Sequence, residues 1–434
     1  MQRVGTARRP GASQSARTIG VAASVVALMA LAACTSGGGN GNGNSPVSHD
    51  TSVGNSPADS SAAASSSPKT NPAVITMPAL SGAISPIRPI TVGIDNGTLT
   101  GVTMTNAAGK HVGGALAGDG TSWHNTEALG YAKSYTIVAQ GKGKDGSPVT
   151  KTSRLTTVTP NNETMPYIDD IYGSSVDNGA TYGIGMIVKV HFDESVNRSK
   201  AEKALHVTTT PSVTGGWYWD NDQDAYWRPK SYYAPGTTVT VAAKVYGVDV
   251  GNGLYGQDDR SVSFKIGQKR VAVADAKTHH VKVYFDNKLV RNMPTSMGQG
   301  GTVQGRNGPI YLWTMPGTYT VIGHENPATM SSDSYGLPAN SPLGYAPEKV
   351  PFATKISTDG IYLHELDTTV NQQGHSNVSH GCLNLNYTNA KWYYNHSRVG
   401  DLVEVVHSGG PHIQFWQGGQ WDVPWSVWLQ HSAL

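Results

Sequence analysis

The chain has 434 residues, of which 38% are hydrophobic and 14% are charged, and its formal net charge is +2. This length predicts several domains, and 51 glycines with 24 prolines favour β-rich domains with many turns over helical bundles. A net charge this close to zero gives no indication of nucleic-acid binding, and the hydrophobic fraction is low for a membrane protein.

The first 33 residues have the pattern of a secretory signal. Arginines within residues 1–17 precede an apolar run that ends at Ala33, which is short and alanine-rich for a membrane span. The small residues before Cys34 resemble a bacterial lipoprotein cleavage site. We therefore expect Cys34 to be lipidated after removal of residues 1–33, and to hold the protein on the outer face of the cell membrane, within the cell wall. The alternative is an ordinary signal peptide followed by a chance cysteine.

The chain contains two cysteines, Cys34 and Cys382. If Cys34 carries lipid, Cys382 is left as a single thiol that has no partner for an internal disulfide. A lone free cysteine is unusual in an exported protein, because the environment outside the cell is oxidising. The pattern indicates a reactive thiol at Cys382.

Residues 34–72 are rich in Gly, Asn and Ser, and we expect a flexible linker there. Residues 73–160 and 161–267 both alternate short apolar stretches with Gly and Asn turns, which predicts two immunoglobulin-like β-sandwiches. One short helical turn is expected at Ser199–Leu205, and neither sandwich shows a catalytic cluster.

The second sandwich contains three acidic residues with the initial spacing of a calcium-binding loop, Asp220, Asp222 and Asp224. The sixth position of that loop is Ala225 instead of glycine, and the twelfth is Ser231 instead of glutamate. We therefore expect a solvated turn between aromatic strands.

Residues 268–407 are predicted to form a further β-rich domain with one short helix. Asp286-Asn287 separates two strand-like runs, which indicates a hairpin. Residues Asn386–His396 are the best helix candidate, with Thr388 as its expected cap. Residues 408–434 contain four tryptophans, which we expect to pack on a neighbouring domain; the alternative is that they bind sugar strands.

The segment Ser379–Leu385 reads SHGCLNL, and His364 precedes Cys382 by eighteen residues. A cysteine nucleophile works as a thiolate, so it needs a nearby base or cation at neutral pH. His364 ends an alternating strand and can reach a cysteine on a neighbouring loop. Gly381 permits a tight backbone in which N–H groups converge on an oxyanion. A working pair of this kind should be alkylated quickly near neutral pH.

Two other interpretations of these residues remain open. Cys382, His364 and His380 supply three ligands of the kind that bind zinc, although no further ligand follows at the usual spacing. Cys382 could also be an inert core residue. The glycine-rich stretch Gly298–Gly308 lacks the lysine of a phosphate-binding loop, so no nucleotide cofactor is expected.

The SHGCLNL run, together with His364, closely resembles the catalytic signature of the L,D-transpeptidases (YkuD-type catalytic domain). Met293–Gly298 and Met330–Tyr345 resemble the actinobacterial lipoprotein branch of that family, which has tandem Ig-like domains. The resemblance covers roughly residues 75–407. It implies cross-linking of two diaminopimelate residues in peptidoglycan stem peptides, through a cysteine thioester and with release of D-Ala.

The resemblance also assigns roles to single residues, and it implies no cofactor or metal. Cys382 is the expected nucleophile and His364 the expected general base. His380 and Gly381 are expected to shape the oxyanion site together with the backbone N–H of Cys382. The expected substrate-binding residues are Tyr345 and Met330 on a lid, with Ser379, Asn384 and Glu365 near the catalytic loop. Family members are acylated by carbapenems, so Cys382 should be acylated as well.

The chain departs from the family pattern after the base histidine. Glu365 and Thr368 stand where relatives usually have serine and tryptophan, and the Glu365 carboxylate would raise the pKa of His364 if the two were close. These changes leave open an impaired enzyme that serves as a wall-binding spacer. Two further alternatives use the same chemistry: L,D-carboxypeptidase action, in which water resolves the thioester, and attachment of a protein to peptidoglycan.

Overall fold

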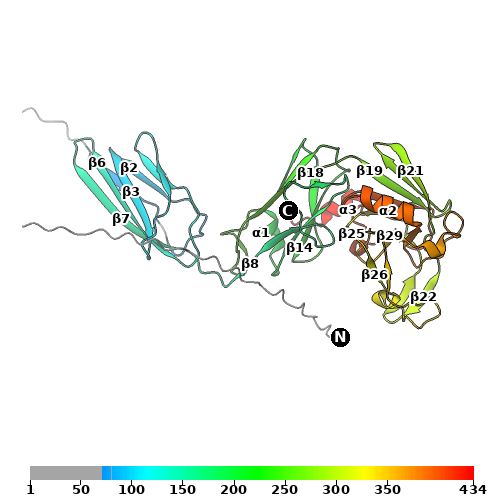
Figure 1. Cartoon of the computed structure of the whole chain (residues 1–434). Helices are drawn as coiled ribbons and strands as arrows, with labels where there is room; N and C mark the ends of the chain where they lie inside the picture. The colour runs from blue at the N-terminus through cyan, green and yellow to red at the C-terminus, as the bar shows by residue number, and fades with distance from the viewer. Residues whose placement is uncertain (1–70, 80) are drawn as a thin grey trace, which may run out of the picture. The chain divides into compact units, whose positions relative to one another are not determined.

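The computed structural model describes residues 71–79 and 81–434. Cys34, the predicted signal peptide and nearly all of the predicted linker lie outside the described residues. The fold is mainly β, as predicted, with a few short helices (Figure 1). No helix in the described part is long and apolar enough to cross a membrane.

The first domain is a sandwich of two sheets that share one core. One sheet has the order β1-β2-β5-β4, and the other has the order β3-β6-β7. Trp123 and Ile137 come from different sheets and are both buried in this core. The strands are β1 (Val74–Thr76), β2 (Thr91–Asp95), β3 (Gly97–Asn106), β4 (Gly114–Leu116), β5 (Ser122–Asn125), β6 (Ser134–Gly143) and β7 (Pro148–Thr156).

The second domain has two four-stranded sheets, ordered β13-β14-β11-β9 and β10-β18-β15-β12, and a small sheet β16-β17-β8. Alternating burial in β11 and β15 points one side of each strand into a common core around Trp219. The elements are β8 (Asn162–Thr164), β9 (Pro166–Asp169), β10 (Thr181–Tyr182), β11 (Val188–Phe192), α1 (Arg198–Glu202), β12 (Leu205–Thr210), β13 (Gly215–Trp219), β14 (Asp224–Pro229), β15 (Thr238–Ala243), β16 (Asp249–Gly251), β17 (Leu254–Gly256) and β18 (Arg260–Ile266).

Asp220 and Asp222 lie in the exposed turn between β13 and β14, as expected, and Asp224 is the first residue of β14. Asp222 pairs with Arg198 and Asp224 pairs with His191.

The third domain has a five-stranded sheet, β21-β20-β19-β31-β24, and a four-stranded sheet, β25-β28-β29-β30. Side chains of both sheets meet in one core with the helix α2. The elements are β19 (Arg270–Asp275), β20 (His280–Phe285), β21 (Lys288–Pro294), β22 (Thr302–Gly305), β23 (Gly308–Tyr311), β24 (Gly317–Thr320), β25 (Gly323–Glu325), β26 (Ala328–Met330), η1 (Ser332–Tyr335), β27 (Glu348–Val350), β28 (Ala353–Lys355), β29 (Tyr362–Glu365), η2 (Asp367–Thr369), β30 (Leu383–Leu385), α2 (Tyr387–His396) and β31 (Leu402–Val406).

Two local predictions in this domain have different outcomes. Asp286 and Asn287 have φ angles of 48° and 66° and close the predicted hairpin of β20 and β21. The predicted cap of the helix is wrong, because the Asn386 side chain, and not Thr388, accepts the backbone N–H of Asn389. Asn386 is therefore the N-cap, and the helix begins at Tyr387.

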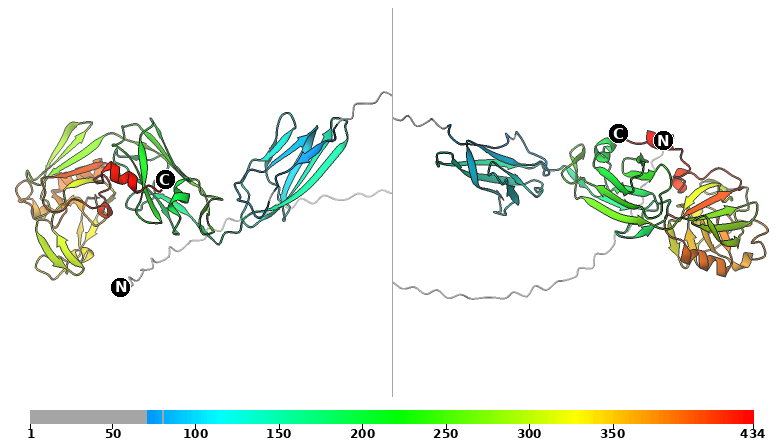
Figure 2. Two further views of the ribbon diagram at one scale, coloured as in Figure 1. Left: turned by 180° about the vertical axis from the view of Figure 1, so that it is seen from behind. Right: turned by 90° about the horizontal axis from the view of Figure 1, so that it is seen from above.

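The C-terminal segment (residues 408–434) carries η3 (Phe415–Gln417) and α3 (Trp425–Gln430), and Figure 2 shows it in red against the second domain. Trp428 is fully buried, and its Nε1 donates to the Gly216 carbonyl. The guanidinium of Arg228 lies over the rings of Trp421, Trp425 and Trp428. The expected packing is confirmed for these three tryptophans, whereas Trp416 remains 66% exposed.

Candidate active site

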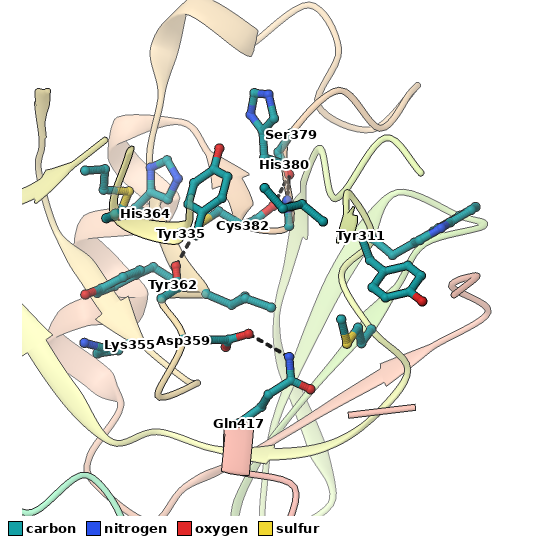
Figure 3. A pocket seen from close by; sticks show the side chains of 18 of the residues that line it. Tyr311, Tyr335, Lys355, Asp359, Tyr362, His364, Ser379, His380, Cys382 and Gln417 are labelled. Carbon is teal, nitrogen blue, oxygen red and sulfur yellow. Dashed lines mark hydrogen bonds between the residues drawn. The ribbon is translucent and has the colours of Figure 1, made fainter. Parts of the chain in front are cut away.

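A cavity of about 1080 Å³ in the third domain contains the residues of the SHGCLNL motif (Figure 3). A space of this size is ample for a peptide segment. Its lining includes residues of the motif, of β29, of the C-terminal segment, and of Met330–Tyr345, which we call the lid. Eight of the nine residues expected in the catalytic and substrate-binding sites line it: Met330, Tyr345, His364, Ser379, His380, Gly381, Cys382 and Asn384.

The pairing of β29 with β30 brings the base and the nucleophile to one place. These strands are parallel and His364 lies opposite Asn384, so Cys382 directly precedes the paired residues of β30. The backbone N–H of Tyr362, on β29, reaches the Cys382 sulfur. The thiol itself donates to the Gly360 carbonyl at 3.6 Å.

His364 is held in one orientation. Its Nδ1 lies 2.8 Å from the backbone carbonyl of Glu365, which makes Nδ1 the protonated nitrogen and leaves Nε2 as an acceptor. The residue is 3% exposed, and burial lowers the pKa of the imidazole to about 4. A buried neutral imidazole with a free Nε2 is the form that a general base requires.

The environment of Cys382 favours the thiol. Burial raises the pKa of Cys382 to about 12, the Tyr362 N–H opposes this increase, and the charge of Asp359 adds to it. The free protein therefore holds a neutral thiol beside a neutral imidazole, and a proton must leave the thiol when substrate arrives.

The loop that carries Cys382 is braced from two sides. Ser379 Oγ donates to the Cys382 carbonyl at 2.6 Å and accepts from the Gly381 N–H at 3.1 Å. Thr314, which is fully buried, donates to the Gly381 carbonyl and accepts from the Gly298 N–H. Gly381 has φ of +145°, a conformation that favours glycine. These contacts fix the turn on which the predicted oxyanion donors lie.

The lid covers one side of the cavity with aromatic side chains. The ring of Tyr345 lies 5.5 Å from that of His380, and Tyr335 from η1 lies 6.5 Å from the same imidazole. Met330 and Tyr345 belong to a cluster that includes Cys382. His380 thus packs beneath the lid, and Figure 3 shows it on the opposite side of Cys382 from Asp359.

Glu365 is the predicted substrate residue that does not line the cavity. Its carboxylate accepts from the Asp367 N–H at 2.8 Å, because strand alternation turns it away from the face that carries His364. The condition under which Glu365 was expected to raise the pKa of His364 is therefore not met, and burial lowers that pKa. Thr368 is exposed and also lies outside the lining.

The zinc alternative receives no support from the geometry. Within residues 71–79 and 81–434, no three His, Cys, Asp or Glu side chains gather as a metal site would require. His380 points toward the lid aromatics, away from a shared centre with His364 and Cys382.

Several lining residues carried no signal in the sequence. Asp359 is a single polar residue outside any motif. The C-terminal segment also reaches the cavity through Pro411, Gln414, Trp416 and Gln417. Gln417 contacts Asp359 from 58 positions away, and nothing local in the sequence indicates such a contact.

Comparison with known proteins yields one consistent family. Residues 81–249 match the model of a bacterial Ig domain, and residues 269–405 match that of the L,D-transpeptidase catalytic domain. L,D-transpeptidase 2 of Mycobacterium tuberculosis (strain CDC 1551 / Oshkosh) is 37% identical over 437 residues, which covers 100% of both chains. L,D-transpeptidase 5 of Mycobacterium tuberculosis (strain ATCC 25618 / H37Rv) is 36% identical and covers 85% of this chain and 78% of its own. A solved L,D-transpeptidase in complex with imipenem is 30% identical, covers 56% of this chain and 99% of its own, and has a TM-score of 0.45.

Proposed function

This chain belongs to the L,D-transpeptidase family, whose members cross-link peptidoglycan, and we propose that it forms these cross-links through a thioester on Cys382. The observation that supports this most directly is the pairing of β29 with β30. It brings an oriented His364 and the thiol of Cys382 into one cavity.

In the first half-reaction, the sulfur attacks the carbonyl of the diaminopimelate residue in a donor tetrapeptide. Nε2 of His364 takes the thiol proton as the C–S bond forms, so the high pKa of the free thiol is no obstacle. Backbone N–H groups around Gly381 and Cys382 stabilise the oxyanion. The C–N bond to D-Ala then breaks, and His364 returns the proton to the leaving amine.

In the second half-reaction, the side-chain amine of another stem attacks the thioester. The new C–N bond forms, the C–S bond breaks, and the amine proton passes through His364 to the sulfur. The same thioester would yield a tripeptide if water attacked instead, which is the L,D-carboxypeptidase alternative. The family favours the amine, because the related proteins are L,D-transpeptidases.

The test is incubation of the protein with purified tetrapeptide stems, followed by product analysis. We expect release of D-Ala and a dimer joined through diaminopimelate, and neither product with Cys382→Ala. Tripeptide without dimer would indicate a carboxypeptidase. An absence of both products from the folded protein would favour the impaired spacer.

We also propose that lipid on Cys34 anchors the protein outside the cell membrane. The support is the sequence alone: small residues before Cys34 at the end of an apolar run. Metabolic labelling with a fatty acid should mark the wild type and leave Cys34→Ala unlabelled. Equal labelling of both proteins would contradict this proposal.

A further inference from the structure

The C-terminal segment holds a carboxylate in place at the edge of the cavity. The side chain of Gln417, which is 3% exposed, donates through Nε2 to Asp359 Oδ2 at 2.6 Å. Its Oε1 accepts from the Gln414 N–H, so both ends of the amide are assigned. Ser357 Oγ donates to the other Asp359 oxygen at 2.6 Å. Both oxygens of Asp359 are thereby held by neutral donors.

This carboxylate lies close to the nucleophile and is open to the cavity. Asp359 is exposed, lines the cavity, and directly precedes Gly360, whose carbonyl lies 3.6 Å from the Cys382 sulfur. None of the ion pairs found within residues 71–79 and 81–434 includes Asp359. Its lone pairs beyond the two hydrogen bonds are available to a cation that enters the cavity.

Two stems must reach the same sulfur, and the cavity offers two different sides. Figure 3 shows His380 on one side of Cys382, and Asp359 with Gln417 on the other. The lid aromatics belong to the first side. The acceptor differs chemically from the donor in that its reacting group is an amine, which is protonated at neutral pH.

We propose that Asp359 binds the protonated side-chain amine of the acceptor stem, and that Gln417 is the residue that positions this carboxylate. The inference rests on the proposed function and adds to it the site that selects an amine over water. A carboxylate and an ammonium form a charge-assisted hydrogen bond, which water in the same place does not.

Asp359 forms and breaks no covalent bond in this scheme. The acceptor binds as an ammonium, loses one proton to solvent, and attacks the thioester as a neutral amine. The C–N bond forms, the C–S bond breaks, and the second proton reaches the sulfur through His364. Asp359 raises the occupancy of the acceptor, and therefore the ratio of cross-linking to hydrolysis.

The test compares the wild type with Asp359→Asn in the full chain. Asparagine preserves the size of the side chain and can keep the bond from Gln417. Tetrapeptide stems are supplied at rising concentration, and the dimer and the tripeptide are measured together. We expect Asp359→Asn to raise the acceptor concentration for half-maximal dimer formation by about five- to tenfold, and to release more tripeptide. Acylation by a carbapenem, followed as a mass increase, should be unchanged.

Two further variants separate the position of the charge from its mere presence. Asp286 lies in the hairpin of β20 and β21, outside the cavity, and also accepts from a glutamine amide, so Asp286→Asn removes an equal charge away from the site. We expect it to leave the half-maximal acceptor concentration unchanged. Gln417→Leu retains the Asp359 charge but removes one of the two hydrogen bonds that hold the carboxylate. It should raise the half-maximal acceptor concentration less than Asp359→Asn does.

The outcomes against the proposal are distinct. If the wild type and Asp359→Asn need the same acceptor concentration for half-maximal dimer formation, and both are acylated normally, this inference is overturned and the proposed function stays intact. An equal effect of Asp286→Asn shows that the position of the charge is irrelevant and overturns the inference too. Loss of acylation in Asp359→Asn assigns the residue to the donor half and contradicts our assignment. Failure of the wild type to be acylated at all overturns the proposed function as well.

Discussion

At the residue scale, the protonation states of His364 and Cys382 determine how the chemistry starts. Burial lowers the pKa of His364 to about 4 and raises the pKa of Cys382 to about 12. A thiolate is therefore scarce in the free protein at neutral pH. Fast alkylation near neutral pH stays a prediction, and with these pKa values it requires His364 to take the thiol proton as the sulfur attacks.

The lowered pKa of His364 predicts the acid limb of the pH profile. The base is active when neutral, so acylation by a carbapenem should persist as the pH falls and should be half lost only near pH 4. The measurement is the rate of acylation from about pH 3.5 to about pH 8, followed by intact-protein mass spectrometry over time. Half-loss near the ordinary histidine pKa of about 6.5 would show that the imidazole is solvated instead of buried.

The residues that the sequence singles out line one cavity, but the residues that support them could not be found from the sequence. Cys382, His364 and Gly381 belong to a short motif whose chemistry can be inferred from residue types. Thr314 could not be found in this way, because its role depends on reaching two backbone segments across the fold. Glu365 was assigned to the substrate site by its place after His364, whereas strand alternation turns its carboxylate away.

At the element scale, long alternating strands and the hairpin at Asp286-Asn287 could be predicted. β26 and β27, the paired strands on either side of the lid, have three residues each, too few to show a period. The lid was therefore expected from family resemblance and not from pattern. The helix α2 lies where the sequence predicts it, but its cap is Asn386 and not the expected Thr388.

The entry to β31 contains a buried acid that should limit stability. Asp401 is 2% exposed, and burial raises the pKa of its carboxyl to about 7. Because the folded pKa lies above the unfolded value near 3.9, stability is lost as the pH rises through 7. Asp401→Asn should raise the unfolding free energy at pH 8 by up to about 4 kcal/mol and change it little at pH 4. Denaturant unfolding at both pH values checks this, and a variant that is less stable at pH 8 would contradict it.

The helix α3 should be an anchor whose loss costs stability. Trp428 is fully buried and donates to the Gly216 carbonyl of the second domain at 2.9 Å. Trp428→Ala should lower the unfolding free energy by about 3–5 kcal/mol. The matched control is Trp416→Ala, which should change it by less than about 0.5 kcal/mol because that side chain is 66% exposed. Equal effects of the two variants in thermal unfolding would refute the anchoring role.

At the scale of the whole molecule, the second and third domains share a continuous contact. The Gly183 N–H donates to the Val399 carbonyl, and the Gly185 N–H to that of Gly400. Trp421 Nε1 adds a bond from the C-terminal segment to the Gly185 carbonyl. The first domain contacts the second domain through hydrogen bonds of Tyr131 and Tyr246. None of its described residues lines the cavity. We therefore expect the first domain to act as a spacer.

Deletion of residues 75–160 tests the spacer role. Cross-linking of stems in solution should remain largely intact, because no residue of the first domain lines the cavity. The comparison is dimer formation by the deletion variant and by the protein with both Ig-like domains, at equal concentration. A well-folded deletion variant that makes no dimer would show that the first domain takes part in the reaction.

The central claim is that Cys382 is a nucleophile within a site shaped for peptidoglycan stems. The most direct measurement is intact-protein mass spectrometry of residues 73–434 after incubation with a carbapenem, beside Cys382→Ala. We predict one covalent adduct on the wild type and none on the variant. A folded wild type without an adduct, or an adduct that persists in Cys382→Ala, would contradict the account and favour a wall-binding spacer.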